Sequence, residues 1–332
     1  MHYLFIFVCN IIIFFSIHFF LKKFSANLKI IDYPSHRKKH QYPATLSGGL
    51  CILIPVYIFN IFLDTNLIIN FILYISILVL ILGLFDDIFN LSAKLRLAIL
   101  LIISFIVFYY GINLNNLGQY YGIGSLEITS FSIFFTVISI IILTNAINFI
   151  DGIDGLAISL ILQALISLFL FIYINNQVVL DTVVFLLIIN CILFFLINTE
   201  IIQLSKSFLG DSGSMSLGFI LACLLIYYSQ NENNYLHPIL VIWCIPILIF
   251  DFFATIFQRI KIKRNPLKAD RLHIHHQLLS NNNSKIVLIK ILTISVVLNF
   301  IGAVSFYMFN ATVSLIVLLV SFTIYLFFKM RY

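Results

Sequence analysis

The sequence has few charged residues, and this shortage excludes a soluble protein. Only 10% of the 332 residues are Asp, Glu, Lys or Arg, while 62% are hydrophobic and the mean hydropathy is +1.10. Apolar runs long enough to cross a hydrocarbon core of about 30 Å recur along the whole chain. Fewer than thirty consecutive residues separate neighbouring runs, so no separate soluble domain fits between them.

Cysteine is also scarce, and its placement excludes a cysteine-based framework. The five cysteines all lie inside apolar runs and show no paired spacing. Cysteine in such surroundings behaves as a small core residue. We therefore expect neither a disulfide nor a cysteine metal site. These residues are Cys9, Cys51, Cys191, Cys223 and Cys244.

The apolar runs predict eleven transmembrane helices, with ten as the alternative count. The predicted spans are residues 3–21, 46–63, 67–84, 96–112, 128–148, 155–174, 178–197, 213–229, 237–257, 286–308 and 311–329. We expect an all-α, polytopic membrane protein with one domain over residues 1–332 and termini on opposite sides. The first run is interpreted as a retained span and not as a signal peptide, because Lys22 and Lys23 follow it.

The basic residues are segregated to one side of this predicted topology. One set of connections comprises loops 22–45, 85–95, 149–154, 198–212 and 258–285, together with the C-terminal tail. Of the 19 Lys and Arg residues, all lie in this set except Arg96, Lys290 and Lys329, which lie at helix ends on the same side. The positive-inside rule makes this side cytoplasmic and places the N-terminus outside. It also explains the pI of about 9.0 without nucleic-acid binding.

Five polar segments lie on the predicted cytoplasmic face. The segment DYPSHRKKHQYPATLSGGL (32–50) is basic and rich in turn residues, which a positive-inside loop alone could explain. The segment GLFDDIFNLSAKLRL (83–97) contains the adjacent residues Asp86 and Asp87, whose carboxylates repel unless a cation or a proton resolves the conflict. A solvated helix cap is the alternative to a metal or proton-transfer role for this pair.

The segment NAINFIDGIDGLA (145–157) places two amides and two acids three residues apart, so that they form one slowly turning stripe on a helix. Helix capping explains Asn145 and Asn148. It does not explain Asp151 and Asp154, each of which precedes a glycine that permits close approach of the backbone to a ligand. Because a carboxylate at the bilayer centre costs roughly 2.5–3.5 kcal/mol or more, we expect this segment at the cytoplasmic surface.

The remaining two segments could bind anions and cations. KSFLGDSGSMSLGF (206–219) surrounds Asp211 with small residues at a predicted helix start, where phosphate or a divalent ion could bind; helix N-capping is the competing interpretation. RNPLKADRLHIHHQLL (264–279) contains three close histidines, which suggest zinc. The neighbouring basic residues and the absence of cysteine from the cytoplasmic loops favour a phosphate or pyrophosphate ligand instead.

Together, these segments indicate phosphoryl transfer at a membrane surface. Hard oxygen ligands without thiolates favour Mg²⁺, with Mn²⁺ as the alternative, and a site at the membrane surface implies a lipid substrate. A lipid or sugar transporter is the main rival hypothesis. Transporters place ionisable groups at the membrane midplane and contain internal repeats, and we find neither pattern in the sequence.

The five segments resemble the polyprenyl-phosphate N-acetylhexosaminyl-phosphate transferase family (glycosyltransferase family 4). The motifs DYPSHRKKH, GLFDDIFN, NAINFIDGIDGLA, FLGDSGSMSLGF and DRLHIHH occur in the family's order. Asn198, Lys206 and Phe208 also match, although NTEIIQLSKSF lacks the proline that members usually have there. ATLSGGL and DRLHIHH are similar to the branch that initiates O-antigen, enterobacterial common antigen or teichoic acid linkage synthesis.

The resemblance implies a magnesium-dependent enzyme of the bacterial inner membrane that transfers a sugar phosphate from a UDP-sugar to undecaprenyl phosphate and releases UMP. It implies Asp211, with Asp87, as metal ligands, and Asp86 or Asp87 as the group that deprotonates or positions the lipid phosphate. The expected catalytic residues are Asp86, Asp87, Asp151, Asp154, His275 and His276. The expected substrate-binding residues are Arg37, His40, Arg96, Asn148, Asn198, Phe208, Arg271 and His273.

UDP-N-acetylglucosamine is the expected donor. UDP-linked N-acetylfucosamine, N-acetylquinovosamine or N-acetylmuramoyl-pentapeptide are the alternatives. The expected partners are the donor, undecaprenyl phosphate and the bilayer, with a homodimer as the one protein assembly considered and no nucleic acid. The resemblance leaves open whether the lipid phosphate attacks directly or through a covalent aspartyl intermediate.

Overall fold

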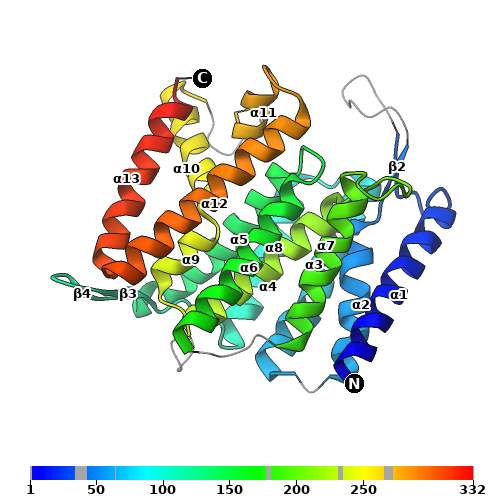
Figure 1. Ribbon diagram of the computed structural model, residues 1–332, viewed down its shortest axis with the longest axis horizontal. Coiled ribbons are helices and arrows are strands. Elements are labelled where there is room, and N and C mark those ends of the chain that lie inside the picture. Colours follow the sequence, from blue (N-terminus) through cyan, green and yellow to red (C-terminus); the bar gives the residue numbers. More distant parts are fainter. Residues whose placement is uncertain are drawn as a thin grey trace.

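The fold is a bundle of helices (Figure 1). A computed structural model describes residues 2–33, 43–63, 65–176, 181–230, 235–264 and 272–331. Its helices are α1 (His2–Phe24), α2 (Gly48–Phe62), α3 (Leu67–Phe89), α4 (Ala93–Tyr109), α5 (Ser132–Ile150), α6 (Leu156–Asn176), α7 (Thr182–Asn198), α8 (Gly210–Gln230), α9 (Pro238–Cys244), α10 (Pro246–Lys261), α11 (Ile274–Leu279), α12 (Ser284–Met308) and α13 (Ala311–Lys329). The all-α prediction is confirmed.

The helices agree in position with the predicted membrane spans. Seven of the described helices are long and apolar enough to cross a membrane, and the number is eight if α9 and α10 count as one span. The helices α2 and α7 are shorter but apolar. The chain is therefore a multi-pass membrane protein, while the count of eleven spans stays a prediction. The two termini lie at opposite ends of the bundle (Figure 1).

The span predicted at residues 237–257 is not one continuous helix, because the chain bends by 83° between α9 and α10. Pro246 begins α10, and a proline disfavours helical geometry in the residue before it. Ile245 accordingly has φ −130° and ψ 40°. The Asn299 amide on α12 donates to the Trp243 carbonyl (2.7 Å), which satisfies a backbone group that the bend leaves without a helical partner.

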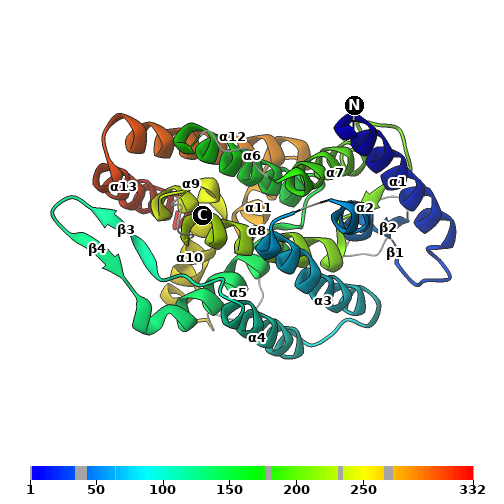
Figure 2. The same ribbon diagram turned by 90° about the horizontal axis from the view of Figure 1, so that it is seen from below.

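Helix α8 lies near the centre of the bundle (Figure 2) and packs against α2, α3, α5 and α6. Small residues let these helices approach closely. A Cβ atom at Gly83 of α3 would lie 2.4 Å from the Ser212 Cα atom, and one at Gly49 of α2 would lie 2.6 Å from the Gly213 Cα atom. The start of α8 is therefore held against two other helices.

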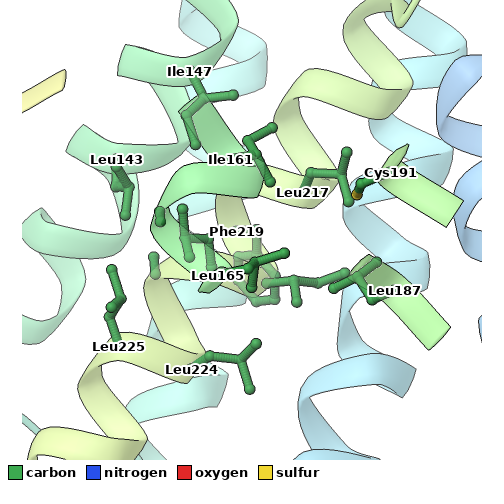
Figure 3. Close-up of a cluster of buried hydrophobic side chains, with 14 of the residues drawn as sticks. Leu143, Ile147, Ile161, Leu165, Leu187, Cys191, Leu217, Phe219, Leu224 and Leu225 are labelled. Carbon is green, nitrogen blue, oxygen red and sulfur yellow. The ribbon is translucent and has the colours of Figure 1, made fainter. Parts of the chain in front are cut away.

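An apolar core surrounds the middle of α8. Figure 3 shows side chains of α5, α6, α7 and α8 meeting there, among them Ile147, Leu165, Leu187 and Phe219. Burial of such side chains provides much of the packing energy of the bundle. Most of the polar side chains described below lie outside this apolar layer, at helix ends and in the connections.

Two small sheets complete the fold. Strands β1 (Ile31–Asp32), β2 (Ala44–Leu46) and β5 (Ser207–Phe208) form one sheet, in which β2 pairs antiparallel with β1 and parallel with β5. This sheet joins the connection after α1 to the connection before α8. The second sheet is a hairpin of β3 (Asn116–Tyr120) and β4 (Gly124–Glu127), followed by the 3₁₀ turn η1 (Thr129–Phe131).

Candidate active site

Asp87 joins the end of α3 to the start of α8. Its Oδ1 atom accepts a hydrogen bond from the Asp211 amide (2.8 Å), and its Oδ2 atom accepts one from the Ser212 amide (3.1 Å). The first amides of a helix have no partner within the helix and carry partial positive charge, so a carboxylate there is stabilised. Gly210 has φ +73°, and a Cβ atom at this position would lie 2.8 Å from the Asp87 Oδ2 atom. The turn therefore requires glycine.

Asp86 points to different donors. It is buried, its Oδ1 atom accepts a hydrogen bond from the Leu91 amide (2.8 Å), and its Oδ2 atom forms an ion pair with Arg96. The repulsion expected between Asp86 and Asp87 is thus relieved by an arginine on one side and by a helix N-terminus on the other. Arg96 also lies 3.7 Å from the Asp211 Oδ2 atom, which places a cation between two of the predicted site carboxylates.

Asp211 lies in the first turn of α8, where α3, α4 and α5 each contribute a polar group. Its Oδ1 atom accepts a hydrogen bond from the Asn148 amide (2.6 Å), which also donates to the Ser214 hydroxyl (2.9 Å). The Asp211 side chain is 36% exposed, whereas that of Asp86 is 4% exposed. Asp211 is therefore the carboxylate that solvent or a ligand reaches more easily.

Asp151 ends α5 and begins the tight turn to α6. Partial burial and the nearby carboxylates of Asp211, Asp87 and Asp154 raise the pKa of Asp151 to about 8. Like charges close together and removal from water both disfavour the ionised form. The raised pKa therefore reflects burial first, and then the negative charge of the acids around the start of α8.

Asp154, from the same turn, forms an ion pair with Lys206 (2.7 Å), whose ammonium also lies 3.5 Å from Glu200. The Lys206 ammonium lies 5.6 Å from the centre of the Phe208 ring, at a distance that permits a cation–π interaction. Asn198 connects the two segments because its Oδ1 atom accepts from the Gly155 amide (2.5 Å) and its Nδ2 atom donates to the Ser207 carbonyl (2.8 Å). The predicted pair Asn198 and Phe208 thus lies beside the turn.

The short helix α11 carries the predicted histidines to the same turn. A Cβ atom at Gly152 would lie 2.8 Å from the His275 Nε2 atom, so this glycine makes room for the ring. His275 is fully buried, and neither ring nitrogen has a hydrogen-bond partner among the described residues. Burial and the neighbouring His276 lower the pKa of His275 to about 3, so the ring is neutral at physiological pH. The His276 ring centre lies 4.0 Å away.

Comparison with known proteins identifies the family. The model described as glycosyl transferase family 4 matches residues 69–229, which contain Asp86, Asp87, Asn148, Asp151, Asp154 and Asp211. Undecaprenyl-phosphate alpha-N-acetylglucosaminyl 1-phosphate transferase of Escherichia coli (strain K12) is 28% identical over 263 residues, covering 78% of this chain and 71% of the relative. Proteins of the same name from Salmonella typhi and Pasteurella multocida are 29% and 28% identical, covering 80% and 77% of this chain and 74% and 73% of their own lengths. The chain belongs to glycosyl transferase family 4.

The family membership confirms the resemblance seen in the motifs, and it supports a glycosyl-phosphate transferase.

Asn145 does not face the site with the other members of the predicted polar stripe, because its side chain donates to the Ile141 carbonyl of its own helix (2.8 Å). Asn148, Asp151 and Asp154 contact other segments, as described above. Three predicted substrate-binding residues lie outside the described part of the chain: Arg37, His40 and Arg271.

Sequence reasoning missed Asp251 of α10, which supports the histidine segment. Asp251 is 2% exposed, and its carboxylate accepts hydrogen bonds from the His273 ring (2.7 Å) and the Ile274 amide (3.0 Å). The predicted substrate-binding residue His273 is therefore paired with an acid in this family member. A signal was present, because an isolated acid inside an apolar run marks a functional candidate.

The residues around the start of α8 fit the magnesium ion expected for this enzyme. No group of three His, Cys, Asp or Glu side chains in the described ranges is arranged to hold a metal by itself. Mg²⁺, however, usually takes one or two protein carboxylates and completes its shell with water and substrate phosphates. The partly exposed Asp211 carboxylate and the acids gathered around it suit such a site.

Proposed function

We propose that this family member transfers N-acetylglucosamine 1-phosphate from UDP-N-acetylglucosamine to undecaprenyl phosphate. The products are UMP and a lipid pyrophosphoryl sugar, which would be the first lipid-linked intermediate of a cell-surface polysaccharide. The names of the relatives describe the transfer of this sugar phosphate to this lipid phosphate for those proteins.

The convergence of carboxylates on the start of α8 carries this proposal. Asp87 binds the Asp211 amide at 2.8 Å, Arg96 lies 3.7 Å from the Asp211 carboxylate, and the pKa of Asp151 is raised to about 8. A site with surplus negative charge beside an arginine suits substrates that arrive as a metal-neutralised pyrophosphate. A transporter does not require acids gathered at helix ends.

The reaction forms one phosphorus–oxygen bond and breaks another. An oxygen atom of the lipid phosphate attacks the β-phosphorus of the UDP-sugar, and the bond from this phosphorus to the oxygen bridging the two phosphates breaks. UMP leaves with the bridging oxygen. Arg96 offsets charge on the phosphates as they approach, and Asp86 or Asp87 accepts a proton when the attacking phosphate carries one. No covalent intermediate is required by this scheme.

The nucleotide binds at the side of the site formed by the α5–α6 turn and the segment before α8. We place the uracil beside Phe208, in the segment that Asn198 fastens to the Gly155 amide (2.5 Å). Lys206, which lies 2.7 Å from Asp154, provides a positive charge near the same turn. The histidine segment at α11 reaches the same turn, where His275 packs against Gly152, and we assign it to contact with the sugar or its phosphate.

Asp211 is the carboxylate that we assign to magnesium, with Mn²⁺ as the alternative ion. Both oxygen atoms of Asp87 already accept amide hydrogen bonds, which makes Asp87 the second choice. When bound, the ion supplies Lewis-acid neutralisation of the pyrophosphate oxygens. Asn148 orients the Asp211 carboxylate through a 2.6 Å hydrogen bond.

The charge distribution along the sequence supports a site on the cytoplasmic side of a bacterial inner membrane, with the N-terminus outside and the C-terminus inside. The end of α11 offers a test of this orientation, since Ser280 is exposed. A cysteine at this position should react with an impermeant maleimide from the cytoplasmic side only. Labelling from the outside would reverse the proposed topology.

The decisive experiment uses purified protein with Mg²⁺, undecaprenyl phosphate and a panel of UDP-sugars. The panel contains UDP-N-acetylglucosamine, UDP-linked N-acetylfucosamine, N-acetylquinovosamine and N-acetylmuramoyl-pentapeptide. We expect UMP release and a lipid pyrophosphoryl sugar with the first donor, and neither product without the lipid. Turnover of another donor alone would retain the reaction and change the sugar, whereas no turnover of any donor would refute the function.

A further inference from the structure

A buried ion pair joins the C-terminal helix to α10. The side chains of Asp251 and Lys329 are 3% and 1% exposed, and their charged groups are in contact. The Lys329 ammonium also donates to the Asp251 carbonyl (3.1 Å) and to the Thr255 hydroxyl. The Tyr325 hydroxyl, one turn earlier on α13, donates to the Asp251 carboxylate (3.0 Å).

Nearly all polar atoms of this buried pair have hydrogen-bond partners within the protein. Removing two charges from water costs several kcal/mol per ion, and the attraction between them offsets this cost only when further hydrogen bonds are present. Lys329 is the last residue of α13, and a basic residue at the end of an apolar helix would be expected to lie in solvent and only set orientation. Its burial therefore calls for another explanation.

The Asp251 carboxylate connects the pair to the histidine segment. It accepts hydrogen bonds from the His273 ring (2.7 Å) and from the Ile274 amide (3.0 Å), which fix the beginning of α11. Immediately beyond, His275 packs against Gly152 in the turn that carries Asp151. A continuous series of contacts thus runs from Lys329 through Asp251 and α11 to the candidate active site.

We infer that Lys329 is a positioning residue for sugar-phosphate transfer, acting through Asp251 and His273 on the placement of α11. The Lys329 ammonium holds the Asp251 carboxylate in place, and the carboxylate holds the histidine segment against the α5–α6 turn. Lys329 lies outside the region of the family-model match, which ends at residue 229. The inference thus extends the residues that serve the reaction to the C-terminal helix. The inference rests on the proposed function.

Two substitutions separate charge from side-chain volume. Lys329→Met leaves the Asp251 carboxylate buried without its ammonium partner, and we expect kcat to fall about 10- to 100-fold because α11 loses its fixed position. Lys329→Arg retains the charge and should recover much of the activity. Arg331→Met is the matched control, since Arg331 is an exposed basic residue at the same end of α13 and should leave kcat unchanged.

A further variant distinguishes positioning from simple stabilisation. Replacing both members of a buried ion pair often restores stability that a single replacement removes. Asp251→Leu/Lys329→Met should therefore melt at a higher temperature than Lys329→Met, yet kcat should stay low because His273 and Ile274 have lost their acceptor. Recovery of kcat in proportion to the folded fraction would show a purely structural role and overturn the inference.

A distance measurement tests the inference without activity. Nitroxide labels at Ser280→Cys and Lys94→Cys, both exposed positions, report the placement of α11 relative to α4 in a Cys9→Ser background. We expect a narrow distance distribution for the wild type and Lys329→Arg, and a broader or shifted one for Lys329→Met and the double variant. An unchanged distribution in folded Lys329→Met protein would overturn the inference. Absence of UMP release by the wild type would instead refute the proposed function.

Discussion

Two groups of buried or half-buried residues in this protein differ in how the negative charge of their acids is balanced. Asp86, Asp87, Asp151 and Asp211 converge on the start of α8 with Arg96 as the cation in contact, and the pKa of Asp151 is raised to about 8. Asp251, by contrast, is surrounded by donors that include the Lys329 ammonium. The first group has an excess of negative charge that a metal ion and a substrate can balance. The second is balanced by the protein itself and holds the beginning of α11 in place.

The largest expected effect is on activity at the unbalanced group. Asp211→Asn removes one negative charge while retaining an oxygen atom that accepts from Asn148. We expect UMP release to fall by about 10²- to 10³-fold, as for loss of one preorganised charge-stabilising group. The melting temperature should not fall, because a repelling charge has been removed. For Asp251→Asn we expect the reverse: a lowered melting temperature should be its primary effect, and the change in UMP release should be secondary.

The control for this comparison is Glu127→Gln, which removes an exposed acid from the β3–β4 hairpin and should change neither quantity. Asp211→Asn protein that melts well below the wild type would mean that the first group is framework as well. If the folded Asp211→Asn variant released UMP at the wild-type rate, Asp211 would not be part of the site.

The second effect concerns the turn that places Asp87 on α8. Gly210→Ala introduces a Cβ atom 2.8 Å from the Asp87 Oδ2 atom at a residue with φ +73°. The left-handed conformation alone costs roughly 1–2 kcal/mol for a non-glycine residue. We expect kcat to fall about 10- to 100-fold in addition, because the shift displaces groups of the site.

The hairpin offers a matched control for strain. Gly122 has φ +78°, but a Cβ atom there would meet nothing within 4 Å. Gly122→Ala should therefore lower the melting temperature slightly and leave kcat unchanged. Equal kcat losses in the two variants would show that backbone strain, and not the contact with Asp87, determines activity.

The third effect compares two lysine–aspartate pairs. Lys206 and Asp154 are 19% and 41% exposed, whereas Lys329 and Asp251 are 1% and 3% exposed. An exposed pair contributes little to stability. Lys206→Met should raise KM for the UDP-sugar about tenfold, corresponding to about 1.4 kcal/mol, without lowering the melting temperature. Lys206→Arg should retain most of the affinity, and Lys285→Met, at an exposed lysine, should change nothing.

If Lys206→Met lowers kcat and leaves KM unchanged, the lysine acts in the transition state and not in nucleotide binding. If it lowers the melting temperature as much as Lys329→Met does, exposure does not distinguish the two pairs.

The first group could be predicted well from the sequence because its members lie in local motifs. Hydropathy marks the helices, and Asp86, Asp87 and Asp211 fall near the ends of apolar runs, where helix ends are expected. Their partners follow less directly. The stripe predicted for residues 145–154 diverges, because Asn145 bonds to its own helix while Asp154 binds Lys206.

The second group could not be assembled from local patterns. Asp251 and Lys329 are separated by 78 positions, and their contact depends on how α10 and α13 pack. The 83° bend at Pro246 that begins α10 was also hidden inside an apolar run of ordinary length. Only the presence of a single acid in that run indicated that a partner was required.

The smallest expected effect is a pH dependence of stability at Asp151. Its pKa in the folded protein is about 8, above the value of about 3.9 for an unfolded aspartate. Between these values the folded state binds more protons than the unfolded state, so stability falls as the pH rises.

Asp151→Asn removes this contribution. Between about pH 5 and about pH 8, the melting temperature of the metal-free wild type should fall a few degrees further than that of the variant, whereas Glu127→Gln should follow the wild type. Added Mg²⁺ should reduce the difference, because a cation near the carboxylates favours their ionised forms. Parallel pH curves for wild type and Asp151→Asn would show that the acids around α8 are already balanced, as they are around Asp251.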